Sequence, residues 1–306
     1  MTDQLIERIQ ALSNPTAVGL DTSLDYLPDA MKESCTTLED AAKAITEFNF
    51  TLIDKLKSIV PAVKVQVAYY EMYGVAGWQA FADTLHYAQR SGLIVIADLK
   101  RNDIGSTAGC YSAAYLGRTS VNGNEYAPFA SDYITVNGYL GEDGIKPFLD
   151  DCQKYNKGIF VLVKTSNPSS GQLQNQQLQG GATLYETVGD LVEAWGTSSV
   201  GKYGYSNVGA VVGATHPQEA AVLRQRLPHT FFLIPGYGAQ GGTAADLAVC
   251  FDAHGRGGIV NNSRGIICAH KAERYNGKIF ADAAYSAACD MQEDIYKALK
   301  MAGKGI

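Results

Sequence analysis

The sequence predicts an α/β fold of the (β/α)8 TIM-barrel type, built as a single domain over residues 1–306. Eight short runs of β-branched and other apolar residues recur along the chain, and segments with helical spacing lie between them. The runs do not alternate with polar residues, which is typical of parallel strands covered on both faces. A doubly wound open sheet is the second choice. We find no linker or compositional break in the sequence, so we expect one domain.

The expected strands differ in how they end. The segments AVGLD and AVKVQ, which form the first two expected strands, each contain a charged residue. The third, LIVIADLK, begins with apolar residues and ends with Asp98 and Lys100. The remaining segments are YITVN, IFVLVKTS, VGAVVG, FFLIP and GIVNNS. In chain order, the expected strands are residues 17–21, 62–66, 93–100, 133–137, 159–166, 208–213, 231–235 and 258–263.

The expected helices are recognised by apolar residues that recur three or four positions apart. An amphipathic helix is expected near residues 1–15, before the first strand. The others are residues 38–58, 78–92, 143–155, 184–196, 216–227, 243–251 and 283–300.

Composition excludes several classes of protein. A hydrophobic content of 46% with 18% charged residues is typical of a packed globular chain. The net charge of −6 argues against a nucleic-acid partner, because such proteins concentrate Lys and Arg on one face. No apolar run approaches the roughly 20 residues of a membrane span. The polar N-terminal segment does not resemble a signal peptide, so we expect a cytoplasmic protein.

The six cysteines point to neither disulfides nor a metal site. They lie far apart, without a CxxC pair and without histidines at metal-ligand spacing beside them. We therefore expect buried, reduced thiols and no bound metal. The six are Cys35, Cys110, Cys152, Cys250, Cys268 and Cys289.

Charged residues gather where the third expected strand ends. Asp98 and Lys100 are two positions apart, so both should project toward the barrel axis, with Leu99 pointing out to the helices. An isolated pair of this kind is usually a structural ion pair. Other strands deliver polar groups to the same rim, however: Asp21 ends the first strand and Lys64 lies in the second. A shared polar site is the better interpretation.

The last two strands lead into segments suited to a phosphate. PGYGAQGG follows the seventh strand and NNSRG the eighth, the two positions where this architecture characteristically holds phosphate on backbone N–H groups. Gln240 can donate from its amide, and Arg264 can grip two phosphate oxygens.

Six motifs in this order resemble orotidine 5'-phosphate decarboxylases, specifically the longer bacterial and protozoal branch of that family. The D-x-K-x-x-D-I block is the most specific of the six. They are GLD (19–21), VKVQ (63–66), DLKRNDI (98–104), VKTSNP (163–168), IPGYGAQ (234–240) and NSRG (262–265).

The resemblance implies decarboxylation of orotidine 5'-monophosphate (OMP) to UMP and CO2, the last step of de novo pyrimidine nucleotide synthesis, without a metal or organic cofactor. It also implies a homodimer with shared active sites. The family's alternating catalytic array corresponds to Lys64, Asp98, Lys100 and Asp103.

The resemblance further implies which residues bind the substrate. Asp21 and Lys64 would hold ribose hydroxyls, and either Thr165 or Ser166 would meet the pyrimidine. Three positions near the end of the chain would hold the phosphate, and three near the third strand would reach into the neighbour's site. The phosphate set is Gln240, Arg264 and the Gly265 backbone; the set facing the neighbour is Asp103, Ile104 and Thr107.

Simple chemistry agrees with these roles. Loss of CO2 leaves an electron pair on a ring carbon that cannot delocalise it, so the site must stabilise and then protonate a carbanion. An ammonium group flanked by carboxylates, as expected for Lys100, suits both tasks. Asp98 would lie near the departing carboxylate, where charge repulsion could favour its loss.

Two rival functions remain at this stage. A Mg²⁺-dependent keto-sugar-phosphate decarboxylase of the same barrel superfamily shares the D-x-K-x-x-D block, although Lys64 and the Ser-Asn-Pro loop favour the nucleotide. A barrel that binds a phosphorylated ligand without turnover is the other. The Gln- and Gly-rich residues 166–181 follow the fifth strand, so they are a candidate lid over the site.

Overall fold

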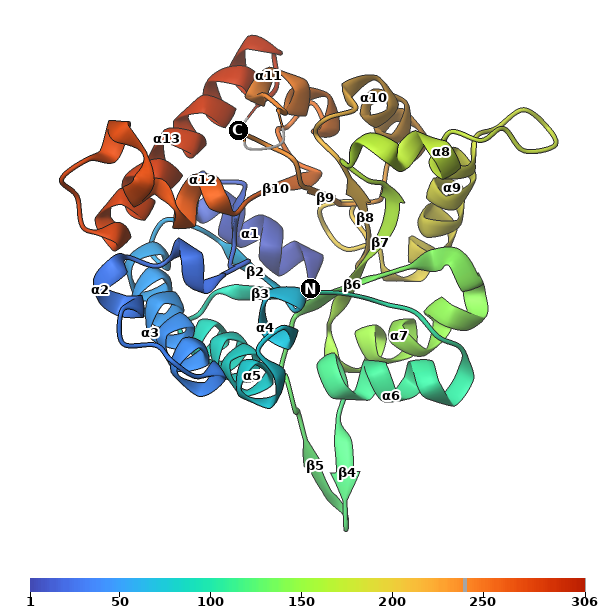
Figure 1. Ribbon diagram of the computed structural model, residues 1–306. Helices are drawn as coiled ribbons and strands as arrows, with labels where there is room; N and C mark the ends of the chain where they lie inside the picture. Colours follow the sequence, from blue (N-terminus) through green and yellow to red (C-terminus); the bar gives the residue numbers. More distant parts are fainter. Residues whose placement is uncertain (239–240, 306) are drawn as a thin grey trace.

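A closed parallel barrel is the centre of the computed structural model, which describes residues 1–238 and 241–305. Strands that follow one another in the barrel sequence are hydrogen-bonded neighbours, and helices surround them (Figure 1). The predicted (β/α)8 fold is therefore confirmed. Around the barrel the order is β1 (Thr16–Gly19), β2 (Ala62–Gln66), β3 (Ile94–Arg101), β6 (Tyr133–Val136), β7 (Gly158–Lys164), β8 (Val208–Val212), β9 (Phe232–Ile234) and β10 (Gly258–Asn262).

The helices cover the outside of the barrel. Two of the longer ones begin with a capping box, in which a Thr side chain and an acidic side chain three residues later satisfy each other's backbone N–H groups: Thr37 with Asp40, and Thr183 with Glu186. The longer helices are α1 (Thr2–Leu12), α3 (Leu38–Leu56), α5 (Gly74–Arg90), α6 (Gly105–Tyr115), α7 (Glu142–Tyr155), α9 (Leu184–Gly196), α10 (Pro217–Arg226) and α13 (Phe280–Met301). The short ones are α2 (Asp29–Lys32), α4 (Ala68–Glu71), α8 (Gly171–Gln174), α11 (Ala244–Leu247) and α12 (Arg264–Ile267).

Apolar side chains fill the barrel from its N-terminal end. Leu5 and Ile6 of α1 are buried against inward-facing residues of the strands, so α1 closes this end. Tyr133 and Phe160 stack inside the barrel with ring centroids 4.8 Å apart. Because this end is filled, the free space inside the barrel lies at the opposite end, where the strands finish.

Two elements between β3 and β6 were not predicted. Helix α6 is rich in Gly, Ser and Thr, which are weak helix formers. The sequence therefore did not indicate a helix here. A hairpin of β4 (Thr119–Val121) and β5 (Asn124–Tyr126) then projects from the barrel (Figure 1). Its turn residues Asn122 and Gly123 both have positive φ, as a type I′ turn requires, and the Asn-Gly pair was a signal for it.

The segment proposed as a lid has some structure of its own. After β7 the chain forms a 3₁₀ turn, Pro168–Ser170, and the short helix α8, and an isolated bridge then joins Gln177 to Thr183. Lys164 at the end of β7 is buried beneath this segment, and its Nζ donates to Asn175 Oδ1 over 2.7 Å. Whether the segment closes over a ligand stays a prediction.

The cysteines and the segment at residues 243–251 differ in part from expectation. All six cysteines are free thiols, but the expectation that they are buried holds only for Cys152 and Cys250. Cys110 on α6 is exposed, and the other three are half-buried. The helix expected over residues 243–251 is α11 followed by a 3₁₀ turn, Ala248–Cys250. Among the helices described, none is long and apolar enough to span a bilayer.

Candidate active site

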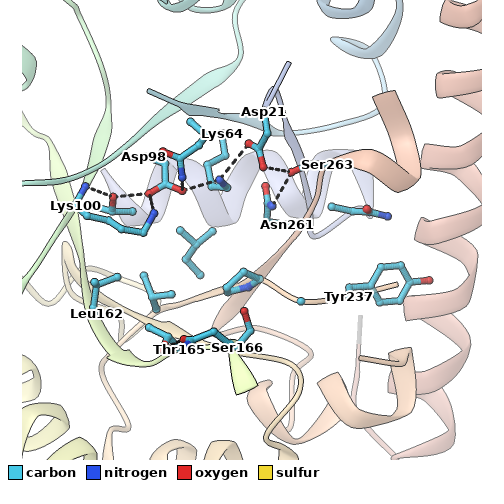
Figure 2. Close-up of a pocket in the computed structure, with 18 of the residues that line it drawn as sticks. Asp21, Lys64, Asp98, Lys100, Leu162, Thr165, Ser166, Tyr237, Asn261 and Ser263 are labelled. Atoms are coloured by element: carbon cyan, nitrogen blue, oxygen red, sulfur yellow. Dashed lines mark hydrogen bonds and ion pairs between the residues drawn. The ribbon is translucent and has the colours of Figure 1, made fainter. Parts of the chain in front are cut away.

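A cavity of about 620 Å³ opens at the C-terminal ends of the strands. Seven of the residues predicted for the site line it, contributed by five strands or the loops that follow them. Figure 2 shows an ionic row along one wall and the loop after β7 on the opposite side. The seven are Asp21, Lys64, Asp98, Lys100, Thr165, Ser166 and Arg264.

The ionic row alternates carboxylates and ammonium groups across three neighbouring strands (Figure 2). Lys64 Nζ lies 3.5 Å from Asp21 Oδ1 and 2.7 Å from Asp98 Oδ2. Lys100 Nζ lies 2.6 Å from the other oxygen of Asp98. The row exists because β1, β2 and β3 are adjacent and in register, with Gly19 beside Lys64 and Gln66 beside Asp98.

The pKa values of the two buried members keep both charged. Burial alone would raise the pKa of Asp98, but Lys64 and Lys100 hold it well below its usual range. Burial alone would lower the pKa of Lys64, and here Asp21 and Asp98 outweigh burial and raise it. Asp98 and Lys64 therefore carry fixed charges at neutral pH, which is the condition for electrostatic stabilisation without reorganisation.

Two neutral side chains complete the surroundings of Asp98, and sequence analysis assigned neither a role. Gln66 Nε2 donates to Asp98 Oδ2 over 2.8 Å, and Thr135 Oγ1 donates to Oδ1 over 2.8 Å. With the two lysines, four donors surround the carboxylate, about as many as its lone pairs can accept. Gln66 lies two residues beyond Lys64, a spacing that indicates a position at the same rim; the sequence offered no such signal for Thr135.

Thr165 and Ser166 both line the cavity, but their hydroxyls are engaged differently. Thr165 Oγ1 donates to Asn167 Oδ1 over 2.6 Å and accepts from Gln174 Nε2 over 2.7 Å. The Ser166 backbone carbonyl accepts from Thr215 Oγ1 over 3.0 Å, which joins this loop to the one after β8. Within the described ranges, the Ser166 side chain makes no hydrogen bond and is free to meet a ligand.

The end expected to hold phosphate is formed by the loops after β9 and β10. Arg264 lines the cavity and is exposed, with Gly236 and Tyr237 nearby on the other loop. The backbone N–H of Gly265 donates to Asn262 Oδ1 over 3.2 Å, and Gly265 borders an adjacent hollow instead of the main cavity. Gln240 lies outside the described residues.

Several residues without a predicted role also shape the cavity. Ser263 Oγ donates to Asp21 Oδ2 over 2.8 Å and so orients the first carboxylate of the row. Tyr69 lines the cavity too. Tyr237 turns its hydroxyl away to donate to Asp294 Oδ2 over 2.6 Å.

Asp103, Ile104 and Thr107 are not among the residues that line this cavity in the described part of the chain. They lie where β3 passes into α6, and Ile104 is 53% exposed. Asp103 Oδ1 accepts from the Ile104 backbone N–H over 2.8 Å. One chain therefore brings together Lys64, Asp98 and Lys100, but not Asp103.

Sequence comparison identifies the family. A profile of the orotidine 5'-phosphate decarboxylase / HUMPS family matches residues 23–276. The chain belongs to this family. Within it, relatives named orotidine 5'-phosphate decarboxylase are similar over nearly their whole length: that of Rhodopirellula baltica is 42% identical over 298 residues, covering 95% of this chain and 97% of the relative. The relative of the same name from Caldicellulosiruptor bescii is 42% identical over 304 residues, which cover 97% of this chain and 98% of the relative.

Solved structures of family proteins are also similar to the chain. The Leishmania donovani OMP decarboxylase has a TM-score of 0.74 with 29% identity, covering 98% of each chain. A putative orotidine 5'-phosphate decarboxylase from Streptomyces avermitilis has a TM-score of 0.79 with 29% identity, covering 97% of this chain and 95% of its own. The resemblance inferred from six motifs is therefore confirmed over almost the full length.

Proposed function

We propose that this chain decarboxylates OMP to UMP and CO2, the last step of de novo pyrimidine nucleotide synthesis. Family membership and relatives at 42% identity with this activity in their names support the substrate. The observation that carries the chemistry is the contact of Lys100 Nζ with Asp98 at 2.6 Å, inside a row of fixed charges. The family description also includes a second group, HUMPS, but both relatives described above carry the decarboxylase name.

In the proposed reaction, the bond between C6 of the pyrimidine and its carboxylate breaks, and the electron pair stays on C6. The Lys100 ammonium stabilises this charge and then transfers a proton to C6, which yields UMP. Solvent water returns a proton to the neutral amine. Asp98 holds the ammonium in place and repels the substrate carboxylate until CO2 leaves.

We propose that the reaction needs no metal or organic cofactor. Asp98 already receives hydrogen bonds from Lys64, Gln66, Lys100 and Thr135, so its oxygens have little capacity left to ligate Mg²⁺. A metal would have to displace two ammonium groups. This argues against the Mg²⁺-dependent keto-sugar-phosphate decarboxylase.

The cavity supports a specific arrangement of substrate contacts. Asp21 and Lys64 lie at one end of the row and would hold the ribose hydroxyls. Ser166, whose hydroxyl has no partner among described residues, is a better candidate than Thr165 for the pyrimidine contact. Arg264, with Gln240 and the Gly265 backbone, would hold the phosphate; the Gly265 N–H would first have to leave Asn262.

We also propose a cytoplasmic homodimer, with residues 1–306 as one domain. Six free thiols suit a reducing compartment. Residues 103–107, which follow β3 and include the exposed Ile104 and Thr107, would supply Asp103, Ile104 and Thr107 to the neighbour's site. Asp103 would then complete the alternating array around the partner's Lys100.

An ultraviolet absorbance assay tests the function directly. Purified chain is mixed with OMP, with and without EDTA, and the change that accompanies conversion to UMP is followed. Equal rates in both samples are expected. Loss of turnover in EDTA, restored by Mg²⁺, would favour the metal-dependent alternative, and no conversion with bound OMP would indicate a binding protein.

A further inference from the structure

Lys100 has an unusual backbone conformation. Its φ is 50°, in the left-handed region that a residue with a Cβ adopts only at an energetic cost. The pairing of β3 with β6 is interrupted at this point: Ala97 pairs with Ile134 and Arg101 with Val136. Three residues of β3 therefore lie opposite the single residue Thr135, which makes a bulge.

One hydroxyl group holds this bulge together. Thr135 Oγ1 accepts from the backbone N–H groups of Leu99 and Lys100, each over 2.9 Å. The same hydroxyl donates to Asp98 Oδ1 over 2.8 Å. A hydroxyl has one hydrogen to donate and two lone pairs, so its capacity is fully used. Thr135 is 1% exposed, which leaves water little room to replace it.

The hydroxyl thereby links the backbone of Lys100 to the partner of its ammonium group. Asp98 Oδ1, which accepts from Thr135, is the oxygen that also accepts from Lys100 Nζ over 2.6 Å. The three residues therefore form a closed set of hydrogen bonds. Thr135 Oγ1 accepts from the Lys100 backbone N–H, Lys100 Nζ donates to Asp98 Oδ1, and Asp98 Oδ1 accepts from Thr135 Oγ1. The branched Cβ of Thr135 restricts rotation about χ1 and so keeps the hydroxyl in this place.

We propose that Thr135 is a positioning residue that sets the location of the Lys100 ammonium for protonation of the carbanion, an inference that rests on the proposed function. Without the hydroxyl, the backbone N–H groups of Leu99 and Lys100 lose their acceptor and the left-handed conformation loses its support. The bulge would relax, and the ammonium would move relative to the reacting carbon. Displacements of about 1 Å reduce rates about 10²-fold in well-oriented sites.

The test compares Thr135→Val, which keeps the shape and removes the hydroxyl, with Thr135→Ser, which keeps the hydroxyl. We expect Thr135→Val to lower kcat about 10²-fold while KM for OMP and the Kd for UMP change less than about threefold. Thr135→Ser should recover most of kcat. Thr46→Val is the matched control, because Thr46 Oγ1 bonds to Ala42 O within α3, away from the cavity.

A kcat of Thr135→Val within about threefold of wild type would overturn the proposal. So would a Thr135→Ser enzyme as slow as Thr135→Val, because packing of the methyl group would then explain the loss. If Thr135→Val fails to fold, Thr135→Ala takes its place in the same comparison. A crystal structure of the variant separates this inference from the proposed function: a Lys100 φ still near 50° disproves the positioning role even if the wild-type chain has another activity.

Discussion

Lys100 and Asp98 are joined by a 2.6 Å contact between side chains two residues apart on one strand. Strand periodicity places both on the cavity face, but the left-handed backbone at Lys100 shows that the contact is not made by regular strand geometry. Asp98 is nearly buried, whereas the Lys100 side chain is 46% exposed to the open cavity. The ammonium is therefore held from one side and available to a ligand from the other.

Replacing Lys100 with Ala should abolish turnover and leave product binding measurable. The substitution removes both the proposed proton donor and the charge that stabilises the carbanion, so kcat should fall at least ~10³-fold. Stopped assays for UMP measure turnover, and calorimetry measures its Kd. Lys146→Ala, which changes an exposed lysine on α7, is the control. A Lys100→Ala enzyme with more than about a tenth of normal activity would contradict the assignment.

Removing the Arg264 guanidinium should affect the rate as well as affinity. Contacts to a remote phosphate can drive closure of the site, so the lost interaction should raise KM and lower kcat/KM by about 10²-fold or more. Initial-rate kinetics with OMP measure both. Arg274→Ala is a suitable control, since Arg274 pairs with Asp290 in a neighbouring hollow. An unchanged kcat/KM in Arg264→Ala would remove Arg264 from the site.

Substituting Asp98 with Asn should destabilise the fold, because Lys64 is buried and would keep only the more distant Asp21 as a charged partner. Breaking a buried ion pair on one side costs about 3 kcal/mol of unfolding free energy. Urea unfolding of Asp98→Asn and Asp21→Asn measures the cost, which should be smaller for Asp21. Equal stability of Asp98→Asn and wild type would show that the row contributes nothing to folding.

The pH dependence of stability offers a second check on Asp98. Its folded pKa lies below the unfolded value, so its contribution is present above about pH 4 and is lost as pH falls toward the folded value. Asp98→Asn should therefore lose less stability than wild type over this acid range. Parallel curves for the two proteins would contradict the lowered pKa.

Sequence predicted the barrel and the ionic row well, because both depend on local patterns. All eight strands occur close to their expected positions, since apolar runs bounded by turns are a strong signal. Two-residue alternation likewise placed Asp98 and Lys100 on the same face, although their contact depends on the bulge at Lys100. The sequence could not predict contacts between segments far apart in the chain. Thr135 on β6 donates to Asp98 on β3, and Ser263 donates to Asp21, which lies 242 residues earlier.

The sequence also failed to predict some local backbone and side-chain conformations. Nothing in the letters around Lys100 indicates a positive φ, because the bulge is produced by pairing with β6 and not by a glycine. Similarly, the choice between Thr165 and Ser166 depends on Gln174 and Asn167, which engage the first hydroxyl. These are consequences of tertiary structure, which overrides local propensity.

A histidine outside the site provides the last prediction. His270 lies edge-on to the stacked rings of Phe48 and Phe280, with ring centroids 6.5 Å and 6.4 Å away. The backbone of Ile267 and Tyr26 faces its imidazole, but both ring nitrogens are buried and neither makes a hydrogen bond of normal geometry in the described part of the chain. Unsatisfied buried polar atoms destabilise a fold, so His270→Phe should raise the unfolding free energy by about 1 kcal/mol. Thermal or urea unfolding at pH 7.5 measures this gain.

The same substitution should alter how stability depends on pH. Burial lowers the pKa of His270 in the folded chain, so below about pH 6.5 the unfolded chain takes up the proton more readily and wild type loses stability. Phe cannot titrate, and the difference in stability between pH 7.5 and 5.5 should shrink in His270→Phe. Burial also lowers the pKa of His216, so part of the acid sensitivity should remain. An unchanged pH dependence, together with a loss of stability at pH 7.5, would mean that the imidazole contributes a favourable interaction in the folded chain.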